Sequence, residues 1–433
     1  MAAKSWKNWS GSVVCNPTEV LFPKSEAEIV NIVNRAKNSN KLIRVVGTGH
    51  SFTQLVHTNE ILLSLDQLQG LISIDRAKNE AEVWAGTKIR ALGELLFQEN
   101  LAQENLGDVD VQSIAGSIMT GTHGTGIELG NLATQVVGLT MVNGKGELIT
   151  LSGNDNDHLF KATLISLGSI GIVTRYKLAL QPSYKLEMVM QKAQLDEVLI
   201  NINSYTSSNR NFEIFSFLYS DKVQIRLTNT TEKPVKKDGF GRYVNEILLE
   251  NYFFWGISEI TRLIPGLSAK MSALSASAIS EMVKINHSHR IYATKRLVKF
   301  NEMEYNVPYE AYPEVVKAIY QLNEKKQFRV HFPLEHRFVK GDDIWLSPAY
   351  QRTSAYIAIH VYKGKSYHYY FREMEALFRD FDGRPHWGKM HFLDADQLAA
   401  SYPKWEAFHE LRKENDPEGV FLNDYLKLLF GQK

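Results

Sequence analysis

The chain has 433 residues, of which 44% are hydrophobic, and this is enough apolar material for two compact units. Its 49 basic and 48 acidic side chains nearly cancel, so charge gives no reason to expect a nucleic acid or an anionic membrane as partner, and a small molecule is the expected ligand. The single cysteine, Cys15, excludes intramolecular disulfides and cysteine-based zinc sites.

The first part of the chain predicts short helices and strands. The pattern indicates an amphipathic helix over residues 26–40, strands over 41–47, 60–65 and 80–86, a helix over 88–100, and a hairpin over 135–152 with Asn143 and Gly144 at its turn. No signal-like N-terminus and no uncharged run of about 18 residues is present, so we expect a cytoplasmic protein without a clear membrane anchor.

From about residue 183 the pattern changes to alternating, aromatic-rich strands over 211–220, 222–229 and 354–362. Before the last of these, residues 246–275 form an aromatic segment, for which a helix packed on the sheet is favoured over one on a membrane surface or in an interface. The tail predicts a helix, a turn and a short apolar end. The fold class is α+β.

The stretch VVGTGHSF, residues 45–52, follows a predicted strand but is not a dinucleotide fingerprint. Phe52 stands at the third glycine position, the next segment predicts a loop and a strand instead of a crossover helix, and no Gly-Lys-Ser/Thr follows. What remains is a turn at Gly47 and Gly49 whose backbone amides can approach an anion closely, with His50 beside it.

A second small-residue segment runs from Ser113 to Gly126. Glycines alternate there with serine and threonine, which suits a phosphate-rich ligand held by backbone instead of by charge. A third segment, from Ser166, could support the same ligand, although each segment alone is also typical of a tight turn. Two such loops without lysine predict a pyrophosphate site.

These motifs resemble a known family. GTGHSF, SIAGSIMTGTHGTG and LGSIGIVT look like the FAD-binding domain of the vanillyl-alcohol-oxidase class. EHRFVKGDDIWLSPAYQR, GRPHWGKMH and DPEGVFLNDYL are similar to its sugar-lactone and alditol oxidases, which include gulonolactone, arabinonolactone and xylitol oxidases. The resemblance runs from Thr18 to the C-terminus and is least distinctive over residues 185–325.

The resemblance implies three segments. Residues 1–182 would form a two-subdomain FAD-binding domain of the PCMH type, residues 183–400 a substrate-binding cap with a large antiparallel sheet covered by helices, and residues 401–433 a segment returning to the FAD domain. It also implies that His50 is bonded covalently to the 8α-methyl group of FAD. No second, cysteine-based tether is expected because Cys15 lies far upstream of the second loop.

The same resemblance supplies a set of cofactor-binding residues. Besides His50 they are Val46, Gly47, Thr48, Gly49, Ser51, Gly107, Ser113, Gly116, Ser117, Thr120, Gly121, Thr122, His123, Gly124, Ile172, His386 and Asn423.

Glu335 and Arg337 are the expected catalytic pair. They are two apart on a probable strand, so they share one face while His336 points away. A surface ion pair is the alternative, but the E-x-R pattern of the family places the pair over the flavin. A guanidinium is a poor base, so Arg337 is expected to stabilise a developing alkoxide, oriented by Glu335.

Lys389 matches the active-site lysine of the family, and we expect it to accept a proton or to hold the substrate oxygen. His360 falls where the xylitol-oxidising relatives carry a threonine in the substrate pocket. No metal is expected, because neither His386 with His391 nor His287 with His289 has a supporting carboxylate or cysteine spacing.

Gly107 and Asp108 bear on the electron acceptor and the substrate. In the class, a glycine at this position leaves room for O2, and Asp108 would favour a substrate with several free hydroxyls and repel an acid. The expected protein is an FAD-dependent oxidase that takes hydride from a carbinol of a sugar-derived aldono-1,4-lactone and passes electrons to O2, giving H2O2. An alditol oxidase, a lactone dehydrogenase with another acceptor, and a non-enzymatic flavin protein remain alternatives, and the sequence does not indicate the oligomeric state.

Overall fold

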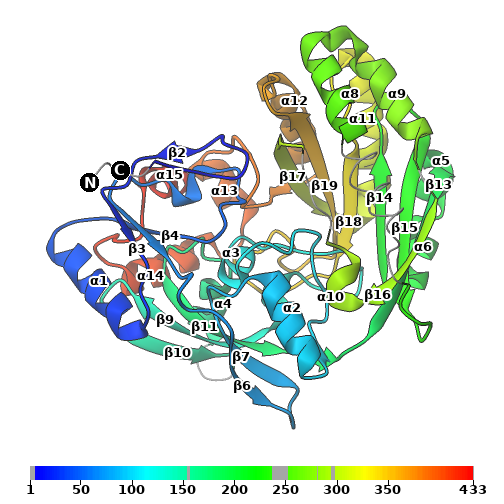
Figure 1. Cartoon of the computed structure of the whole chain (residues 1–433). Helices are drawn as coiled ribbons and strands as arrows, with labels where there is room; N and C mark the ends of the chain where they lie inside the picture. The colour runs from blue at the N-terminus through cyan, green and yellow to red at the C-terminus, as the bar shows by residue number, and fades with distance from the viewer. Residues whose placement is uncertain (1–4, 154–156, 237–251, 280, 294–297, 433) are drawn as a thin grey trace.

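The computed structural model describes residues 5–153, 157–236, 252–279, 281–293 and 298–432 (Figure 1). Two groups of β-sheets organise these residues. One group comes from the N-terminal part of the chain, and the other is a single large sheet formed from residue 185 onward. The α+β class expected from the sequence is confirmed.

The N-terminal group contains a parallel and an antiparallel sheet. The parallel sheet has the order β3-β5-β4, and the antiparallel sheet the order β10-β9-β11-β7-β6. Their strands are β3 (Glu19–Leu21), β4 (Ile43–Val46), β5 (Ile61–Ser64), β6 (Leu71–Asp75), β7 (Glu80–Trp84), β9 (Val136–Asn143), β10 (Leu148–Ser152) and β11 (Gly171–Ala179). The helices are α1 (Glu26–Asn38), α2 (Ile89–Gln98), α3 (Ile114–Met119) and α4 (Asp157–Leu164).

Helix α1 shows how local sequence sets an element. Ser25 caps its N-terminus by accepting a hydrogen bond from the backbone N–H of Glu28. Ile29, Val33 and Ala36 recur at helical spacing and are fully buried against the N-terminal sheets. The amphipathic pattern therefore both forms the helix and fixes the face that it buries.

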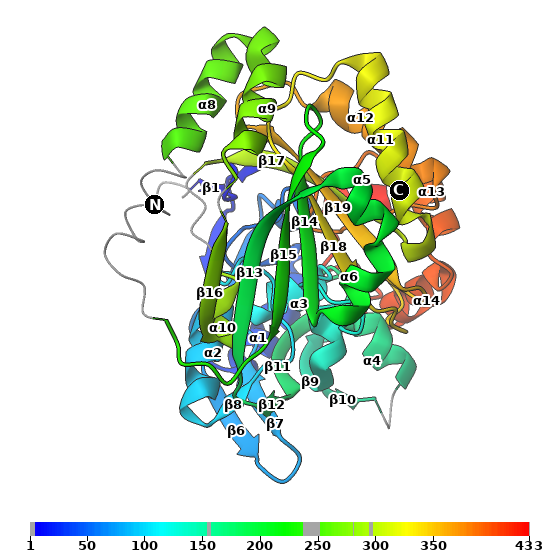
Figure 2. The same cartoon turned by 90° about the vertical axis from the view of Figure 1, so that its right-hand side faces the viewer.

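The large sheet has eight antiparallel strands in the order β16-β13-β15-β14-β18-β19-β17-β20 (Figure 2). These are β13 (Lys185–Gln194), β14 (Asn211–Ser216), β15 (Lys222–Thr230), β16 (Met282–His287), β17 (Phe300–Pro308), β18 (Leu334–Val339), β19 (Ser354–Tyr362) and β20 (Arg384–Pro385). One face packs on α5 (Leu195–Ile200), α6 (Ile202–Ser208), α11 (Tyr312–Lys326) and α12 (His368–Asp380). This side forms a hydrophobic core of its own.

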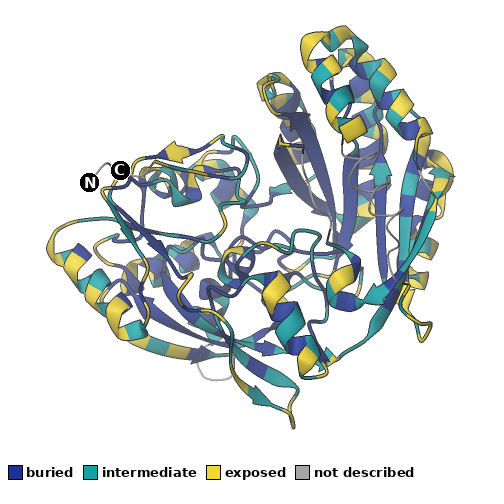
Figure 3. Cartoon of the chain, in the orientation of Figure 1, coloured by how far each residue is buried: buried dark blue, intermediate teal, exposed yellow. Residues whose placement is uncertain are grey.

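Both faces of the central strands are covered. All nine residues of β19 are buried, as the dark blue strand in Figure 3 shows. Ile357, Ile359 and Val361 join the core under the helices, whereas His360 and Tyr356 point to the opposite face. That second face carries polar residues, and its burial is what creates the site described below.

The C-terminal helices pack with the N-terminal group. They are α13 (Ala395–Ser401), α14 (Trp405–Asn415) and α15 (Asp424–Leu429). Trp405, Phe408 and Leu426 belong to the same hydrophobic cluster as Ile29 of α1. Residues from the N-terminal and C-terminal parts of the chain therefore share one core, although the domain boundaries 1–182, 183–400 and 401–433 stay a prediction.

Three local expectations differ from the structure. The hairpin turn spans residues 144–147, because the side chain of Asn143 accepts hydrogen bonds from the backbone amides of Lys145 and Glu147. The second small-residue segment includes helix α3, and the apolar tail includes helix α15. Glycine and serine content concealed α3, and α15 is only six residues long.

The aromatic segment predicted over 246–275 forms α8 (Tyr252–Leu263) and α9 (Ser268–Ser277), while residues 246–251 lie outside the described residues. Ile257, Ser258 and Thr261 are buried, and the outer side exposes apolar side chains such as Trp255 and Leu263. Among the described residues, no helix has the length and apolar character needed to cross a bilayer.

Small elements complete the chain: β1 (Trp6–Lys7), β2 (Val14–Cys15), β8 (Leu101–Ala102), β12 (Gln181–Pro182) and α10 (Ser288–Ile291).

Candidate active site

A first cavity lies at the carboxyl end of β4. The turn that follows this strand and the segment at α3 meet there so closely that a Cβ on Gly47 would lie 2.3 Å from Oγ of Ser113. The cavity is lined mainly by backbone and small side chains, including Val46, Gly47, Thr48, Gly49, Ser113, Gly116, Thr120 and Ile172. Arg44 and Lys88 also line the cavity, but Arg44 donates to backbone carbonyl oxygens and Lys88 pairs with Asp66. Close backbone approach is therefore the property that suits this cavity to a pyrophosphate.

The N-terminal hairpin covers the outside of the GTGHS turn. The backbone N–H of Trp9 donates to the carbonyl oxygen of Gly49 at 2.7 Å, and Nδ2 of Asn8 donates to the carbonyl oxygen of Ser51 at 3.0 Å. The Trp9 indole stacks on the His50 imidazole with ring centroids 5.7 Å apart. Gly49 has a φ of +69°, which favours glycine. The hairpin thereby fixes the position of His50.

A second cavity adjoins the first and reaches the polar face of the large sheet. The two share the lining residues His50, Ser51, Gln112 and Thr120. The second is also lined by Trp9, Phe52, Gly107, Asp108, Thr122, His123, Phe300, Glu302, Glu304, Glu335, Arg337, His386, Gly388 and Lys389. An elongated ligand can therefore extend from the small-residue loops, past His50, to a group of charged side chains that we call the charged wall. The wall consists of Asp108, Glu213, Arg226, Glu302, Glu304, Glu335, Arg337 and Lys389.

The charged wall follows from strand register. Residues two apart on a strand share a face, and the pairing aligns Glu213 of β14 with Arg337 of β18. It also aligns Glu335 with Ala358 of β19 and Ala358 with Glu304 of β17. Side chains from β14, β17 and β18 thus form rows on one face of the sheet.

Arg337 is the centre of one ion cluster. Its Nη2 lies 3.3 Å from Oδ2 of Asp108, its Nε lies 3.3 Å from Oε2 of Glu213, and it also bonds Glu335. Burial alone would lower the pKa of Arg337, but Glu335, Asp108 and Glu213 raise it well above its ordinary value. Arg337 is therefore a permanent cation, and the alternative of a surface ion pair is wrong because the pair is buried.

Lys389 forms the second cluster with two glutamates of β17. Its Nζ lies 2.5 Å from Oε1 of Glu302 and 3.8 Å from Oε2 of Glu304. Burial would raise the pKa of Glu302, but Lys389 and His360 lower it to about 2. Burial likewise opposes ionisation of Glu304, yet His123 and Lys389 hold its pKa well below its ordinary value. Lys389 thus lies against two ionised carboxylates.

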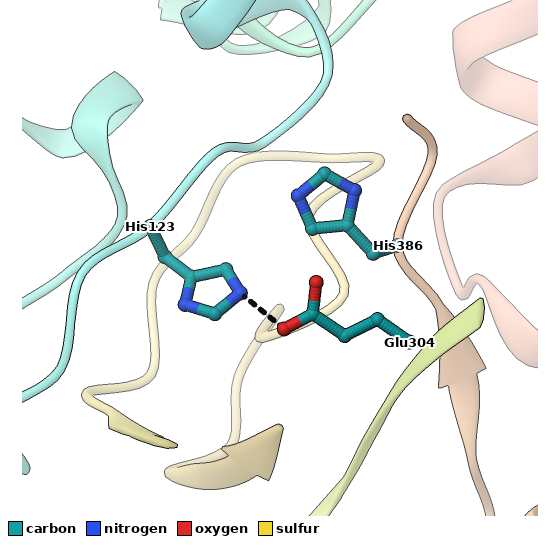
Figure 4. Close-up of side chains that lie close together, drawn as sticks. All are labelled: His123, Glu304 and His386. Atoms are coloured by element: carbon teal, nitrogen blue, oxygen red, sulfur yellow. Dashed lines mark ion pairs between the residues drawn. The ribbon is translucent and has the colours of Figure 1, made fainter. Parts of the chain in front are cut away.

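Glu304 also lies between two histidines (Figure 4). Nε2 of His123 is 3.2 Å from Oε1 of Glu304. Nδ1 of His386 accepts a hydrogen bond from the backbone N–H of Gly388, and burial lowers the pKa of His386 to about 3, so this imidazole is neutral. The three side chains offer possible metal-ligand atoms within 4.8 Å of one another, but a cation there would compete with the Lys389 ammonium for Glu304.

Gly107 and Asp108 form the edge of this cavity. A Cβ on Gly107 would lie 3.1 Å from the carbonyl oxygen of His123, so only a small residue fits without a shift. Asp108 is joined to Arg337 by the contact given above, and its carboxylate lines the cavity. Both residues therefore line the second cavity beside Arg337, and the roles expected of them from the sequence stay predictions.

Five of the predicted site residues line neither cavity. Oγ of Ser117 donates to the carbonyl oxygen of Ile114, and the amide of Asn423 donates to the carbonyl oxygen of His57 at 2.8 Å, tying α15 to the turn before β5. His360 reaches the wall only through Glu302, with Nε2 3.3 Å from Oε1. The others are Gly121, against Ile165, and Gly124, against Leu106 and Asn105.

Sequence reasoning missed several residues of the wall. Glu302, Glu304 and Glu213 lie in strands with no motif, and Trp9 lies in a hairpin far from the other site residues in sequence. The available signal was the placement of acidic residues two apart in NEMEY, within a strand that is otherwise apolar. Charged residues at one face of a buried strand need partners, so this pattern indicates a polar site.

Comparisons with known proteins agree with this geometry. The chain matches the family described as D-arabinono-1,4-lactone oxidase over residues 176–429 and the FAD-binding domain family over residues 17–152. It is 36% identical over 427 residues to L-gulono-1,4-lactone dehydrogenase of Mycobacterium tuberculosis (strain ATCC 25618 / H37Rv), covering 98% of this chain and 99% of that protein. It is 31% identical to L-gulonolactone oxidase of Mus musculus, covering 98% of each.

Among solved structures, a cholesterol oxidase from B. sterolicum superposes with a TM-score of 0.82 at 17% identity, covering 98% of this chain and 96% of that one. A solvent-stable cholesterol oxidase superposes with a TM-score of 0.84 at 18% identity, covering 98% and 97%. At this identity the likeness concerns the fold alone. With its FAD-binding domain and its match to the family across most of the remaining residues, the chain belongs to the sugar-1,4-lactone oxidase family of FAD-dependent oxidoreductases.

Proposed function

We propose that the protein oxidises a carbinol of a sugar-derived aldono-1,4-lactone, with FAD as the hydride acceptor and O2 as the final electron acceptor. The observation that carries the proposal is the buried Arg337 cluster, which faces a cavity continuous with the small-residue cavity at His50. The relatives named as gulonolactone and arabinonolactone oxidases favour a lactone over an alditol.

The residues of the wall suit this chemistry. Removing hydride from a carbinol leaves a carbonyl and requires the O–H proton to depart to a base or to solvent. Arg337 is a fixed cation with planar donors, so it can stabilise the oxygen as it becomes negative, while Glu335 and Glu213 hold its orientation. A catalytic role for Arg337 as a base is disfavoured because its ionised form is so strongly stabilised.

Lys389 is assigned a related role. Lys389 lines the substrate cavity between Glu302 and Glu304, and its amino group can donate a hydrogen bond to the substrate oxygen. His386 is neutral at physiological pH and lines the same cavity. When ionised, the Asp108 carboxylate can only accept hydrogen bonds, which suits a neutral substrate with free hydroxyls.

FAD fits the pair of cavities, with the small-residue loops holding its pyrophosphate. FAD supplies a two-electron acceptor at this site. His50 stands where the two cavities meet, and we assign it the covalent bond to the 8α-methyl group. After acid denaturation and centrifugation, the yellow colour should remain with the protein, whereas His50→Ala should release its FAD. His57→Ala is the matched control, since His57 lines neither cavity.

The acceptor is tested separately. The small side of the cavity at Gly107 favours O2 as the electron acceptor, because a glycine leaves room for it. The relative from Mycobacterium tuberculosis is named a dehydrogenase, so another electron acceptor is the second candidate. Reduced protein mixed with air-saturated buffer should reoxidise rapidly and release H2O2. Slow reoxidation in air with rapid reduction of an artificial electron acceptor would contradict the proposal and favour the dehydrogenase.

The substrate is tested by a peroxide-release screen of 1,4-lactones against xylitol and sorbitol. Turnover of lactones at a higher kcat/KM than alditols supports the proposal, and the reverse order would assign the protein to alditols. We also place the protein in the cytoplasm, as its sequence led us to expect, and fractionation of the native cells tests this placement.

A further inference from the structure

The ring nitrogens of His123 both face hydrogen-bond acceptors. Nδ1 lies 2.8 Å from the carbonyl oxygen of Gly124, and Nε2 lies 3.2 Å from Oε1 of Glu304. A carbonyl oxygen can only accept, so Nδ1 must carry a proton. A neutral imidazole would then direct the lone pair of Nε2 at the glutamate oxygen.

The contact between Nε2 of His123 and Oε1 of Glu304 needs one proton to be a hydrogen bond, and either residue can carry it. Either Glu304 is protonated and donates to His123, or His123 is an imidazolium and donates to an ionised Glu304. The second arrangement is favoured because Oε2 of Glu304 also faces the ammonium of Lys389 at 3.8 Å, and Arg337 acts on the same carboxylate. The remaining groups near His123, the Tyr356 ring at 3.7 Å and the neutral His386 ring at 5.7 Å, carry no negative charge.

The charge balance of the wall points the same way. The described wall holds five buried or half-buried carboxylates but three basic side chains, and leaving buried charge uncompensated is costly. His360 repeats the geometry of His123, with Nδ1 3.3 Å from the carbonyl oxygen of Pro333 and Nε2 3.3 Å from Glu302. A second donated proton on His123 therefore lies where negative charge is in excess. The carboxylates are Asp108, Glu213, Glu302, Glu304 and Glu335, and the basic side chains are Arg226, Arg337 and Lys389.

We propose that His123 donates from both ring nitrogens, to the carbonyl oxygen of Gly124 and to Glu304, and that the cation so formed in the cavity wall stabilises the negative charge that hydride transfer creates there. His123 lines the cavity, whereas His360 does not, so the two histidines have different roles despite their similar pairing. Glu304 is then a positioning residue that acts through His123. This inference rests on the proposed oxidation for its catalytic consequence but not for the charge state itself.

Glu304→Gln is a matched test because it exchanges one oxygen for an NH2 group. The amide can donate to Nε2 of a neutral His123, while Nδ1 still donates to Gly124, so the hydrogen bonds persist and both charges disappear. In FAD-loaded protein labelled with 15N-histidine, NMR at pH 8 should show both His123 ring nitrogens protonated. In Glu304→Gln only one should be protonated.

The functional readouts are the midpoint potential of the bound flavin and the steady-state constants. We expect Glu304→Gln to shift the potential to a more negative value and to lower kcat roughly a hundredfold with little change in KM, the size seen when one stabilising donor is removed from a transition state. His123→Gln should have the same effect, and the double variant should add little to either single change.

Glu94→Gln is the control. Glu94 forms a similar pair with His289, at 3.3 Å, but lines neither cavity, so its exchange should leave the potential and kcat unchanged. A His123 ring with one protonated nitrogen in the wild-type protein would overturn the proposal, as would an unchanged potential in Glu304→Gln. If the NMR result holds but no lactone is oxidised, the proposed function fails and the charge assignment stands.

Discussion

The two cavities are built by opposite means. The cofactor cavity depends on shape, since Gly47, Gly49 and Ser113 bring backbone close to the ligand and contribute no charge. The substrate cavity depends on charge, since Arg337 and Lys389 are each surrounded by carboxylates on one face of a sheet. This difference has a consequence for mutation. A larger side chain in the first cavity should weaken cofactor binding, whereas the exchange of one charged side chain in the second cavity should lower catalysis.

The largest effect is expected at Arg337. Arg337→Lys keeps the charge but loses the planar donors that contact three carboxylates, so kcat/KM should fall by roughly 10²- to 10³-fold. Steady-state kinetics measure the change. The control is Arg226→Lys, whose arginine also bonds Glu213 but does not line the cavity. Comparable losses in both variants would show that the planar donors support the structure of the sheet and do not act on the substrate.

Gly47→Ala tests the shape of the cofactor cavity. The new Cβ would lie 2.3 Å from Oγ of Ser113, and overpacking of about 1–3 kcal/mol should weaken FAD binding by roughly tenfold to a hundredfold. The affinity is measured by titration in the His50→Ala background, where FAD exchanges freely. Gly256→Ala, with no atom within 4 Å of its Cβ, is the control.

The clash in Gly47→Ala has a specific rescue. Ser113→Gly removes the side chain that the new Cβ meets, and a glycine N-cap costs α3 only a few tenths of a kcal/mol. The double variant should recover most of the affinity for FAD. A double variant no better than Gly47→Ala would mean that the contact with Ser113 is not what limits the space.

Acid should destabilise the sheet side through buried neutral histidines. Burial lowers the pKa of His336 from 6.5 to about 3. The unfolded chain therefore binds a proton that the native chain does not over this interval, so the stability is fully present above pH 6.5 and falls as the pH drops. One histidine contributes about 1.4 kcal/mol per pH unit within the window.

His336→Gln should reduce this slope and can still bond Oγ of Ser216, the present partner. Urea unfolding of the FAD-loaded protein between pH 6.5 and 4.5 measures the slope. His158→Gln changes an exposed side chain and serves as the control. An unchanged slope in His336→Gln would remove buried histidines on the sheet as a cause of acid sensitivity.

The smallest effect is expected at Asp108. Asp108→Asn keeps the size but adds a donor and removes a charge, so the KM for a lactone should rise roughly fivefold, the equivalent of one hydrogen bond, with kcat little changed. The variant should also be inhibited more strongly by an open-chain sugar acid, because less negative charge repels it. Inhibition equal to that of the wild type would place Asp108 outside substrate recognition.

Much of the site was predictable because its signals are local. The GTGHS turn, the small-residue segment and the Glu335–Arg337 alternation each depend on a few neighbouring residues, and strand periodicity was sufficient to predict that His336 points away. Helix α1 was equally predictable from its cap and apolar spacing. The role of Asn423 was not predictable in this way. Its side chain caps α15, and an asparagine that caps a helix has the same local sequence pattern as one that contacts a cofactor.

The amino-acid sequence by itself determined the family, the cofactor and those cavity residues that belong to motifs. These features depend on residue types at short spacings, which can be recognised without the fold. Only the tertiary structure decided which charges meet. Glu213, Glu304 and His123 come from distant segments, and strand register sets their partners. The sequence around a buried carboxylate does not indicate which basic group it will contact. The protonation inferred for His123 therefore depends on the three-dimensional contact with Glu304.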